Sequence, residues 1–190
     1  MSKPAARRAA RARLAALSDA ERDRAGREVA RRIWTVPEVA SARVLLLYAS
    51  LAGEVPTDAI AREAWRRGHT VTYPRCLPEA RELALHRVHA PHELEAGTYG
   101  IREPALACPR VGLEEIDVAL VPGLAWDRTG ARLGRGAGYY DRLFARPGWR
   151  ALRVGVFFGA QEAPDGVPVD AWDAPLEVIV TEREVWRPRG

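Results

Sequence analysis

The sequence predicts an α/β fold: a single domain with an open, mainly parallel sheet and helices on both faces. Short apolar runs, typical of strands buried on both faces, occur at residues 44–48 and 116–121. Segments of helical composition lie between such runs, and this alternation favours a parallel sheet. Because a chain of 190 residues can bury one substantial core, we expect residues 1–190 to form one domain.

Two helices are expected at the start of the chain. Residues 4–17 are rich in Ala, Arg and Leu, which favour helix formation. The segment Ser18-Asp-Ala-Glu21 is a capping box that begins a second helix, reaching about residue 34. Pro37 is expected to end this element.

A strand–helix–strand unit is expected next. The run at residues 44–48 predicts its first strand, residues 58–67 predict a helix that ends at Gly68, and residues 71–73 predict the second strand. Residues 83–88 can add another strand.

The second half of the chain continues this pattern. Residues 90–112 are rich in Pro and Gly and are expected to be irregular, and a strand follows at 116–121. A Gly-rich loop then leads to a helix that begins at Tyr139, and two strands are expected at residues 152–157 and 178–181. Ligands in such sheets bind beyond the carboxyl ends of the strands, so the loops after these strands are expected to meet.

The segment at residues 130–144, GARLGRGAGYYDRLF, is typical of a phosphate-binding loop. Its alternating glycines allow positive φ angles and expose backbone N–H groups to an anion. Arg132 and Arg135 add positive charge, and the first N–H groups of the following helix are expected to point to the same place. The glycines concerned are Gly134, Gly136 and Gly138.

The spacing of this loop distinguishes it from two better-known ones. A Walker A loop needs Lys-Ser or Lys-Thr, which does not occur in the chain, and a dinucleotide fingerprint needs G-x-G-x-x-G after the first strand. A Gly-rich turn before a helix can also be only a flexible connection. The flanking basic residues favour the phosphate cradle.

The composition excludes several classes of protein. With 47% hydrophobic and 28% charged residues and no long apolar run, the chain is expected to be a cytoplasmic protein without a membrane or secretory segment. Cys76 and Cys108 are too few for a disulfide scaffold and are expected to be buried thiols. Three histidines are evenly spaced, but lack partners for a metal site and are read as ordinary residues. They are His86, His89 and His92.

The net charge of +4 is concentrated at the N-terminus. The arginines of the first helix are expected to form a solvated face rather than an arm that binds a polyanion. Lys3 is the only lysine in a chain that otherwise uses arginine, which fits an ammonium group that reaches a nucleotide phosphate.

The residues carry a resemblance to one family. The string RLGRGAGYYDR, residues 132–142, resembles the ATP-binding signature of the 5-formyltetrahydrofolate cyclo-ligases, also called methenyltetrahydrofolate synthetases. Weaker matches follow the family's order along almost the whole chain. They are Lys3 and Arg7 (K-x-x-x-R), Tyr48-Ala-Ser with Glu54-Val-Pro-Thr57 (Y-x-S, E-V-x-T), Pro74-Arg75, Gly100-Ile-Arg-Glu-Pro104 (G-I-x-E-P), Val121-Pro-Gly-Leu-Ala-Trp-Asp127 (V-P-G-L-A-F-D) and Pro175-Leu-Glu-Val-Ile-Val-Thr-Glu182 (P-L-D-x-I-I-T-E).

The resemblance implies a Rossmann-like sheet and a specific reaction. In the family, ATP phosphorylates the formyl oxygen of 5-formyltetrahydrofolate, N10 attacks the activated carbon, and loss of phosphate leaves 5,10-methenyltetrahydrofolate. Such a reaction depends on positioning and charge neutralisation more than on a protein nucleophile. ATP is then the co-substrate, Mg²⁺ the cofactor, and the partners are small molecules rather than nucleic acid or membrane, with the chain acting as a monomer.

The resemblance also assigns roles to residues. Arg135 and Tyr140 are expected at the reacting groups, and the helices within residues 1–34 are expected to contribute to the nucleotide site. The nucleotide site comprises Lys3, Arg7, Arg132, Leu133, Gly134, Arg135, Gly136, Ala137, Gly138, Tyr139 and Tyr140. The folate site comprises Leu51, Glu54 and Tyr140, and the metal ligands are Asp141 and Asp173.

Several of these assignments leave an alternative open. Asp141 can be a helix-start residue that only complements the dipole, and Glu54 can be an exposed loop acid. The family motif ends in His-Asp where this chain has Trp172-Asp173, so Asp173 can instead cap a turn and Asp170 becomes another candidate ligand. Trp172 is then a core residue or part of a pocket wall. Asp127 is explained by turn chemistry, and Gln161 matches a family residue near the pocket.

Three functions follow from the sequence. The first is an ATP- and Mg²⁺-dependent cyclo-ligase, for which turnover is decisive. The second is a non-catalytic relative that binds nucleotide or folate without turnover. The third is a nucleic-acid-binding protein, whose tight binding would fall steeply with salt.

Overall fold

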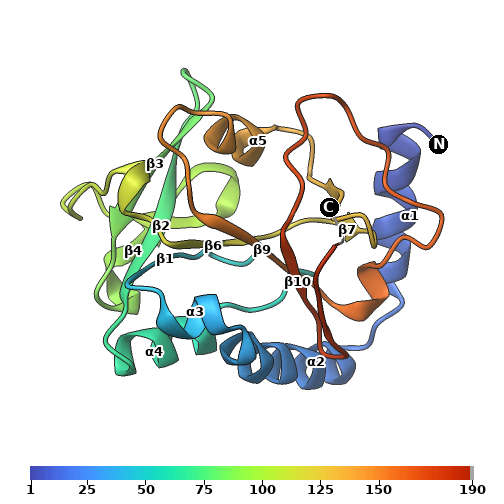
Figure 1. Ribbon diagram of the computed structural model, residues 1–190, viewed down its shortest axis with the longest axis horizontal. Coiled ribbons are helices and arrows are strands. Elements are labelled where there is room, and N and C mark those ends of the chain that lie inside the picture. Colours follow the sequence, from blue (N-terminus) through green and yellow to red (C-terminus); the bar gives the residue numbers. More distant parts are fainter. Residues whose placement is uncertain (189–190) are drawn as a thin grey trace.

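The computed structural model describes residues 1–188 and is built around a seven-stranded sheet with the order β11-β10-β9-β6-β1-β2-β3 (Figure 1). The strands from β2 to β10 in this order are parallel, and the edge strands β3 and β11 are antiparallel to their neighbours. The predicted open, mainly parallel sheet is confirmed. Its strands are β1 Val44–Leu46, β2 Thr70–Leu77, β3 Glu82–Arg87, β6 Val118–Val121, β9 Leu152–Val156, β10 Val178–Val180 and β11 Val185–Trp186.

The strand order creates a switch point between β1 and β6. The chain leaves β1 toward β2 at one side and later returns to β6 at the other side, where Leu45 is in register with Val118. The segments that leave the carboxyl ends of β1 and β6 therefore diverge and leave a crevice between them. This crevice is where ligands bind in open α/β sheets.

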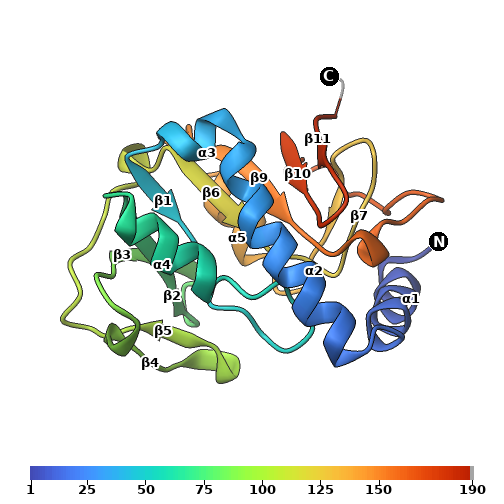
Figure 2. The same cartoon turned by 90° about the horizontal axis from the view of Figure 1, so that it is seen from below.

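Helices cover both faces of the sheet, as predicted. In Figures 1 and 2, α2 (Asp19–Arg32), α3 (Pro37–Ser41) and α4 (Asp58–Arg66) lie on one face, and α5 (Tyr139–Phe144) lies on the other. The long N-terminal helix α1 (Lys3–Ala15) stands at one end of the sheet. The described part of the chain also contains five short 3-10 helices: Ile33–Thr35, Pro91–Glu93, Thr98–Gly100, Leu113–Glu115 and Gly159–Gln161. No helix within residues 1–188 is long and apolar enough to cross a membrane.

The two faces of the sheet bury separate apolar clusters. Leu45 and Leu120 contribute to the cluster beneath α2 and α4, whereas Leu46 and Val121 contribute to the cluster that includes Phe144 of α5. Successive strand residues point to opposite faces, so each apolar run supplies both clusters. This is why the strand sequences read as continuous apolar runs rather than as alternating patterns.

Local sequence signals explain most helix and strand ends. Ser18 accepts a hydrogen bond from the backbone N–H of Glu21, whose carboxylate accepts one from Ser18 N at 2.8 Å, so the predicted capping box is present. The expectation that Pro37 ends the second helix is wrong: a 3-10 turn ends it, and Pro37 begins α3. Proline suits the first helical position because its missing N–H would be unpaired there.

The segment 90–112, expected to be irregular, contains a hairpin of β4 (Leu94–Ala96) and β5 (Arg102–Pro104). A second hairpin, of β7 (Ala125–Trp126) and β8 (Arg132–Leu133), precedes the Gly-rich loop. Strands of two or three residues are too short to show the alternation from which strands are recognised.

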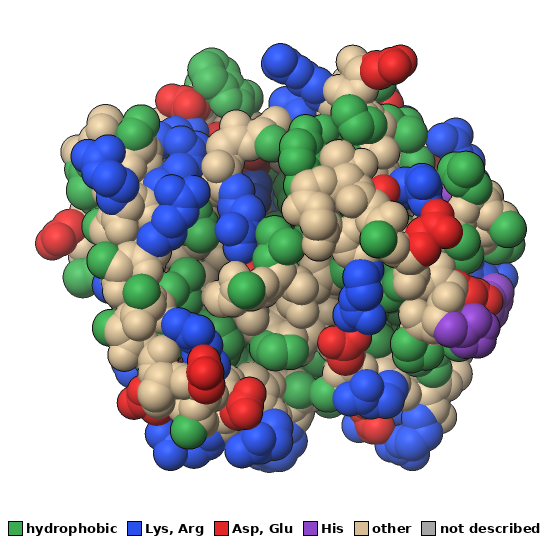
Figure 3. All heavy atoms as spheres, turned by 180° about the vertical axis from the view of Figure 1, so that it is seen from behind, with side chains coloured by type: hydrophobic (Ala, Val, Ile, Leu, Met, Phe, Trp, Pro, Cys, Tyr) green, Lys and Arg blue, Asp and Glu red, His purple; other side chains and the backbone are tan. Residues whose placement is uncertain are grey.

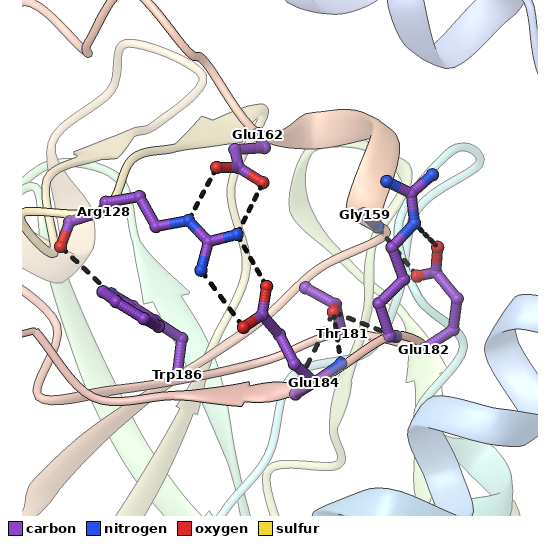
Figure 4. A network of polar contacts seen from close by, with 8 residues as sticks. Arg128, Gly159, Glu162, Thr181, Glu182, Glu184 and Trp186 are labelled. Carbon is purple, nitrogen blue, oxygen red and sulfur yellow. Dashed lines mark hydrogen bonds and ion pairs between the residues drawn. The ribbon is translucent and has the colours of Figure 1, made fainter.

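An arginine ties the β7–β8 hairpin to the last strands. Arg128 donates hydrogen bonds to Glu162 at 2.8 and 3.2 Å and to Glu184 at 2.7 and 3.1 Å (Figure 4). Its guanidinium also lies 4.5 Å from the ring centroid of Trp186 on β11. These contacts fix the turn that joins β7 to β8, and β8 leads into the Gly-rich loop.

Candidate active site

A cavity of about 720 Å³ lies beyond the carboxyl ends of β1 and β6. The segments after these two strands, the Gly-rich loop, the start of α1 and the β4–β5 hairpin all line it. In Figure 3, Lys and Arg side chains gather beside a hollow on the α1 side of the molecule. Every residue assigned to a site from the sequence lines this cavity: Lys3, Arg7, Leu51, Glu54, Arg132, Leu133, Gly134, Arg135, Gly136, Ala137, Gly138, Tyr139, Tyr140, Asp141 and Asp173.

The Gly-rich loop uses its glycines in two ways. Gly136 and Gly138 have φ angles of +115° and +69°, which side chains disfavour. Gly134 does not have a positive φ, so that part of the sequence expectation is wrong; its carbonyl instead accepts a hydrogen bond from Arg7 Nε at 3.0 Å. A Cβ on Gly136 would lie 3.4 Å from Arg7 Cζ, so the absence of a side chain lets the guanidinium rest on the loop.

Three cations in the cavity are each paired with a carboxylate. Arg132 donates to Asp141 at 2.5 Å and Arg135 donates to Glu54 at 2.9 Å. Lys3 donates to Asp170 at 2.6 Å and to Asp173 at 2.5 Å. These pairs hold long cationic side chains in place, which reduces the entropy lost when an anion binds.

Two arginines keep donors that no described residue uses. Arg132 is 8% exposed, and its Nε has no hydrogen-bond partner within residues 1–188. Arg7 forms no ion pair in the same part of the chain. A buried donor without a partner costs free energy, which applies to Arg132, whereas Arg7 is only partly buried. Both side chains are suited to donate hydrogen bonds to phosphate oxygens.

The pairing of Lys3 shifts two pKa values. Burial on its own would raise the pKa of Asp173, but hydrogen bonds from Lys3 and from the backbone N–H of Asp170 outweigh it and hold that pKa below its usual value. Burial would lower the pKa of Lys3, and its two hydrogen-bonded carboxylates raise it above the usual value. Both groups are therefore charged at neutral pH.

The two tyrosines at the start of α5 stay protonated at neutral pH. Burial raises the pKa of Tyr140 well above its usual range. The hydrogen bond to Tyr99, 3.3 Å between the two phenol oxygens, and burial raise the pKa of Tyr139 to about 12. Both phenols can donate hydrogen bonds to a ligand, and neither is suited to act as a base.

Exposure and contacts explain the roles of two residues singled out in the sequence, Trp172 and Asp127. Trp172 is 71% exposed and lines the cavity, so it is part of the wall and not of the core. Asp127 Oδ1 accepts from Thr129 and Ala131 in its own turn, and Oδ2 accepts from Val167 N at 2.7 Å, so both carboxylate oxygens are occupied.

Gln161 does not line the cavity. Its buried amide donates to Gly123 O at 2.7 Å, and its oxygen accepts from Phe158 N at 2.8 Å. Gly123 follows β6 and does line the cavity, so Gln161 supports the wall from behind. 

The cysteines and histidines form no metal centre among residues 1–188. Cys108 is buried, as expected, but Cys76 is only partly buried and lines the cavity. His86 is buried and its Nδ1 lies 2.7 Å from Cys108 O, which is a structural contact.

The sequence interpretation missed the β4–β5 side of the cavity. Tyr99, Ile101, Arg102 and Glu103 line it, and Glu103 is only 2% exposed. The motif Gly100-Ile-Arg-Glu-Pro104 was the available signal, but no role followed from the motif alone.

The fold and the cavity define a doubly wound α/β protein with a basic Gly-rich loop and carboxylates at the switch point of its sheet. The 5-formyltetrahydrofolate cyclo-ligase family model matches residues 1–182, and the chain belongs to this family.

Relatives from bacteria and yeast agree with this membership. The 5-formyltetrahydrofolate cyclo-ligase of Escherichia coli (strain K12) is 33% identical over 181 residues, covering 93% of this chain and 98% of that protein. The enzyme of the same name from Saccharomyces cerevisiae is 34% identical, covering 74% of this chain and 76% of its own.

Solved structures show the same fold. The 5,10-methenyltetrahydrofolate synthetase of Aquifex aeolicus is 37% identical to the chain with a TM-score of 0.87, covering 100% of this chain and 94% of that one. The synthetase of Mycoplasma pneumoniae is 20% identical with a TM-score of 0.76, covering 96% of this chain and 99% of its own, and supports the fold alone.

Proposed function

We propose that the chain is a 5-formyltetrahydrofolate cyclo-ligase that consumes ATP, requires Mg²⁺ and releases ADP, phosphate and 5,10-methenyltetrahydrofolate. One observation carries the proposal: a single cavity joins a basic Gly-rich loop to a second wall formed by the β4–β5 hairpin. A nucleotide triphosphate suits the first part, and a flat ring system with N–H donors suits the second.

The basic side of the cavity is suited to the triphosphate. Arg7 and Arg132 have unused donors, and Arg135 and Lys3 can exchange their carboxylate partners for phosphate oxygens. Arginine pairs with phosphate in a bidentate manner, which positions as well as neutralises it. The backbone at Gly136 and Gly138 is open to close approach by an anion.

The acids beside the loop fit a Mg²⁺ ion that is shared with the nucleotide. Residues 1–188 contain no group of three or more potential ligands, so a metal held by protein alone is not supported. Mg²⁺ usually takes one or two carboxylates and completes its shell with phosphate oxygens and water. Asp141 and Asp173 line the same cavity as the loop and would supply those carboxylates. Mg²⁺ would neutralise charge on the phosphates during transfer.

The chemical steps need few protein groups. The formyl oxygen attacks the γ-phosphorus of ATP and ADP leaves; N10 then attacks the formyl carbon and loses its proton, and the C–O bond breaks to release phosphate. Arg135 would stabilise the transferred phosphoryl group, and Glu54 would orient the Arg135 guanidinium. Tyr140, protonated at neutral pH, would donate a hydrogen bond to a reacting oxygen.

Turnover tests this proposal. Purified protein is expected to convert 5-formyltetrahydrofolate to the methenyl product, followed by its near-ultraviolet absorbance, only when both ATP and Mg²⁺ are present. Binding of ATP or folate by folded protein without any turnover would instead identify a non-catalytic relative. The cytoplasmic location, the monomeric state and the absence of a nucleic-acid partner stay predictions from the sequence.

A further inference from the structure

The β4–β5 hairpin places a buried acid in the cavity wall. Glu103 on β5 lines the cavity although only 2% of the residue is exposed. Its Oε1 accepts a hydrogen bond from Cys76 N on β2 at 3.2 Å, which joins the hairpin to the central sheet. Gly97 packs against the same side chain, since a Cβ there would lie 2.5 Å from Glu103 Cδ. The carboxylate is therefore held in one position.

Among the residues that the structure describes, no cation pairs with this acid. The neighbouring arginines have other partners, because Arg102 pairs with Asp58 at 2.8 Å and Arg75 pairs with Glu95 at 3.2 Å. Within residues 1–188, Glu103 forms no ion pair. Its donors are the Cys76 N–H and the weak donor of the Cys76 thiol.

The negative charge of Glu103 also acts on the Cys76 thiol. Burial, and after it the negative charge of Glu103, raise the pKa of Cys76 to about 12, so the thiol is neutral at physiological pH. A carboxylate offers about four acceptor sites, and a buried one with few donors is costly. Spare acceptor capacity in a cavity wall favours a ligand that brings N–H groups.

Glu54, the acid expected to contact folate, has much less spare capacity. Its Oε1 accepts from Arg135 Nε at 2.9 Å, and its Oε2 accepts from Leu51 N at 2.9 Å. Its contacts hold the loop after β1 and orient Arg135. Apolar side chains that line the same cavity are suited to a flat ring: Pro74, Leu83 and Ile101.

We propose that Glu103 is a specificity-determining residue whose carboxylate accepts hydrogen bonds from the 2-amino group and adjacent ring N–H of the folate pyrimidinone. This assignment rests on the proposed cyclo-ligase function and divides the acids between two roles. Glu103 selects the folate ring, and Glu54 organises Arg135 at the phosphoryl group.

Calorimetric binding of 5-formyltetrahydrofolate and of its 2-desamino analogue tests the assignment. Loss of a hydrogen bond to a charged group weakens binding roughly 10- to 100-fold. Wild-type protein is expected to bind the analogue more weakly by that factor. Glu103→Gln and Glu103→Ala are expected to bind the parent folate more weakly, to lose most of the discrimination between the two ligands, and to keep the affinity for ATP.

A matched control comes from the same hairpin. Glu95 on β4 is directly across from Glu103 in register but half of its side chain is exposed. Glu95→Gln is expected to leave the binding of both ligands unchanged. A second measurement needs no variant. The NMR amide signal of Cys76 in wild-type protein is expected to shift on addition of 5-formyltetrahydrofolate and not on addition of ATP.

Each opposite result overturns the assignment. The assignment is wrong if wild-type protein binds the two ligands equally, if the Glu103 variants keep full discrimination, or if the Cys76 amide signal does not move. The proposed function stands in each of these cases if turnover persists. Wild-type protein that neither binds nor converts 5-formyltetrahydrofolate would overturn both.

Discussion

Arg135 Nε donates a hydrogen bond to Glu54 Oε1 at 2.9 Å across 81 positions of the chain. Arg135 lies in the Gly-rich loop, and Glu54 follows β1, so the pair spans the two segments that line the switch-point crevice. The Glu54 side chain is only 7% exposed, whereas that of Arg135 is 39% exposed. The acid is thus a fixed support, and the guanidinium is the partner that can reach a ligand.

This pair predicts a large effect of Arg135→Ala on catalysis. Removal of one preorganised donor from developing charge costs about 100- to 1,000-fold in kcat, and we expect that range. Glu54→Gln is expected to lower kcat less, because Arg135 remains but is less well oriented. Steady-state kinetics with both substrates measures this.

Arg146→Ala is the control for the loss of an arginine near α5. Arg146 pairs weakly with Glu82 at 3.9 Å and does not line the cavity. Its substitution is expected to leave kcat unchanged. Full activity in Arg135→Ala would contradict the proposed role of the pair.

Asp141→Asn is expected to change the requirement for Mg²⁺. The substitution removes a charged ligand candidate next to Arg132 and keeps the size of the side chain. We expect the half-saturating Mg²⁺ concentration to rise by about tenfold, since one carboxylate contact to a divalent ion is weakened. Titration of turnover against Mg²⁺ at saturating ATP measures it. Asp127→Asn should leave the Mg²⁺ requirement unchanged, because the Asp127 carboxylate already binds its own turn and Val167 N.

Lys3→Met is expected to change the acid stability of the protein. The pKa of Asp173 is lower in the native state than in the unfolded state. As the pH falls, the unfolded state therefore binds more protons than the native state does. The stabilisation is therefore present above the ordinary pKa of 3.8 and is lost as the pH falls through the native pKa. Without Lys3 this acid-dependent loss should shrink.

Thermal unfolding from pH 6 to about pH 3 measures that difference. The pH dependence that comes from Lys3 has the opposite direction, because the pKa of Lys3 is raised in the native state. Its stabilisation is present below the ordinary pKa of 10.5 and is lost as the pH rises through the native pKa. Arg43→Met removes a surface arginine that lies 4.0 Å from Asp117 and should keep the wild-type acid profile. Identical profiles for Lys3→Met and wild type would show that the Lys3 pair adds no stability.

Arg128→Gln is expected to reduce stability without affecting turnover. Arg128 joins Glu162 and Glu184 (Figure 4), but its side chain is 43% exposed, so solvent screens the pairs. We expect a loss of about 1 kcal/mol in the free energy of unfolding, measured by denaturant titration. Activity assays at 25 °C should show no change, and a large loss of kcat would place Arg128 closer to the chemistry than its contacts indicate.

The elements that could be predicted are those with a local cause. The strands at β1 and β6 are continuous apolar runs because both of their faces are buried. The Gly-rich loop is visible in the sequence because positive φ angles at Gly136 and Gly138 require glycine. Such signals need no knowledge of distant contacts.

What could not be predicted depends on packing between distant segments. Glu103 looks like an ordinary strand acid until the β4–β5 hairpin folds against Cys76 on β2. Trp172 could have been core, and only the path of the chain leaves it exposed at the cavity. Hydrophobic pattern therefore gives the sheet, whereas the burial of individual polar groups comes from tertiary structure.

Gly136→Ala is expected to disrupt the phosphate cradle. Its φ angle of +115° is unfavourable for alanine, and the new Cβ would lie 3.4 Å from Arg7 Cζ. Backbone strain of this kind costs about 1–3 kcal/mol, and relief of the strain would move the loop and Arg7 together. ATP affinity is therefore expected to fall by more than the affinity for folate.

Gly148→Ala is the matched control, because Gly148 has a φ of +92° and open space around its Cβ but does not line the cavity. Both variants should lose stability in denaturant titration, and calorimetry should show weakened ATP binding only in Gly136→Ala. Equal ATP affinity in the two variants would mean that the shape of the Gly-rich loop does not contribute to nucleotide binding.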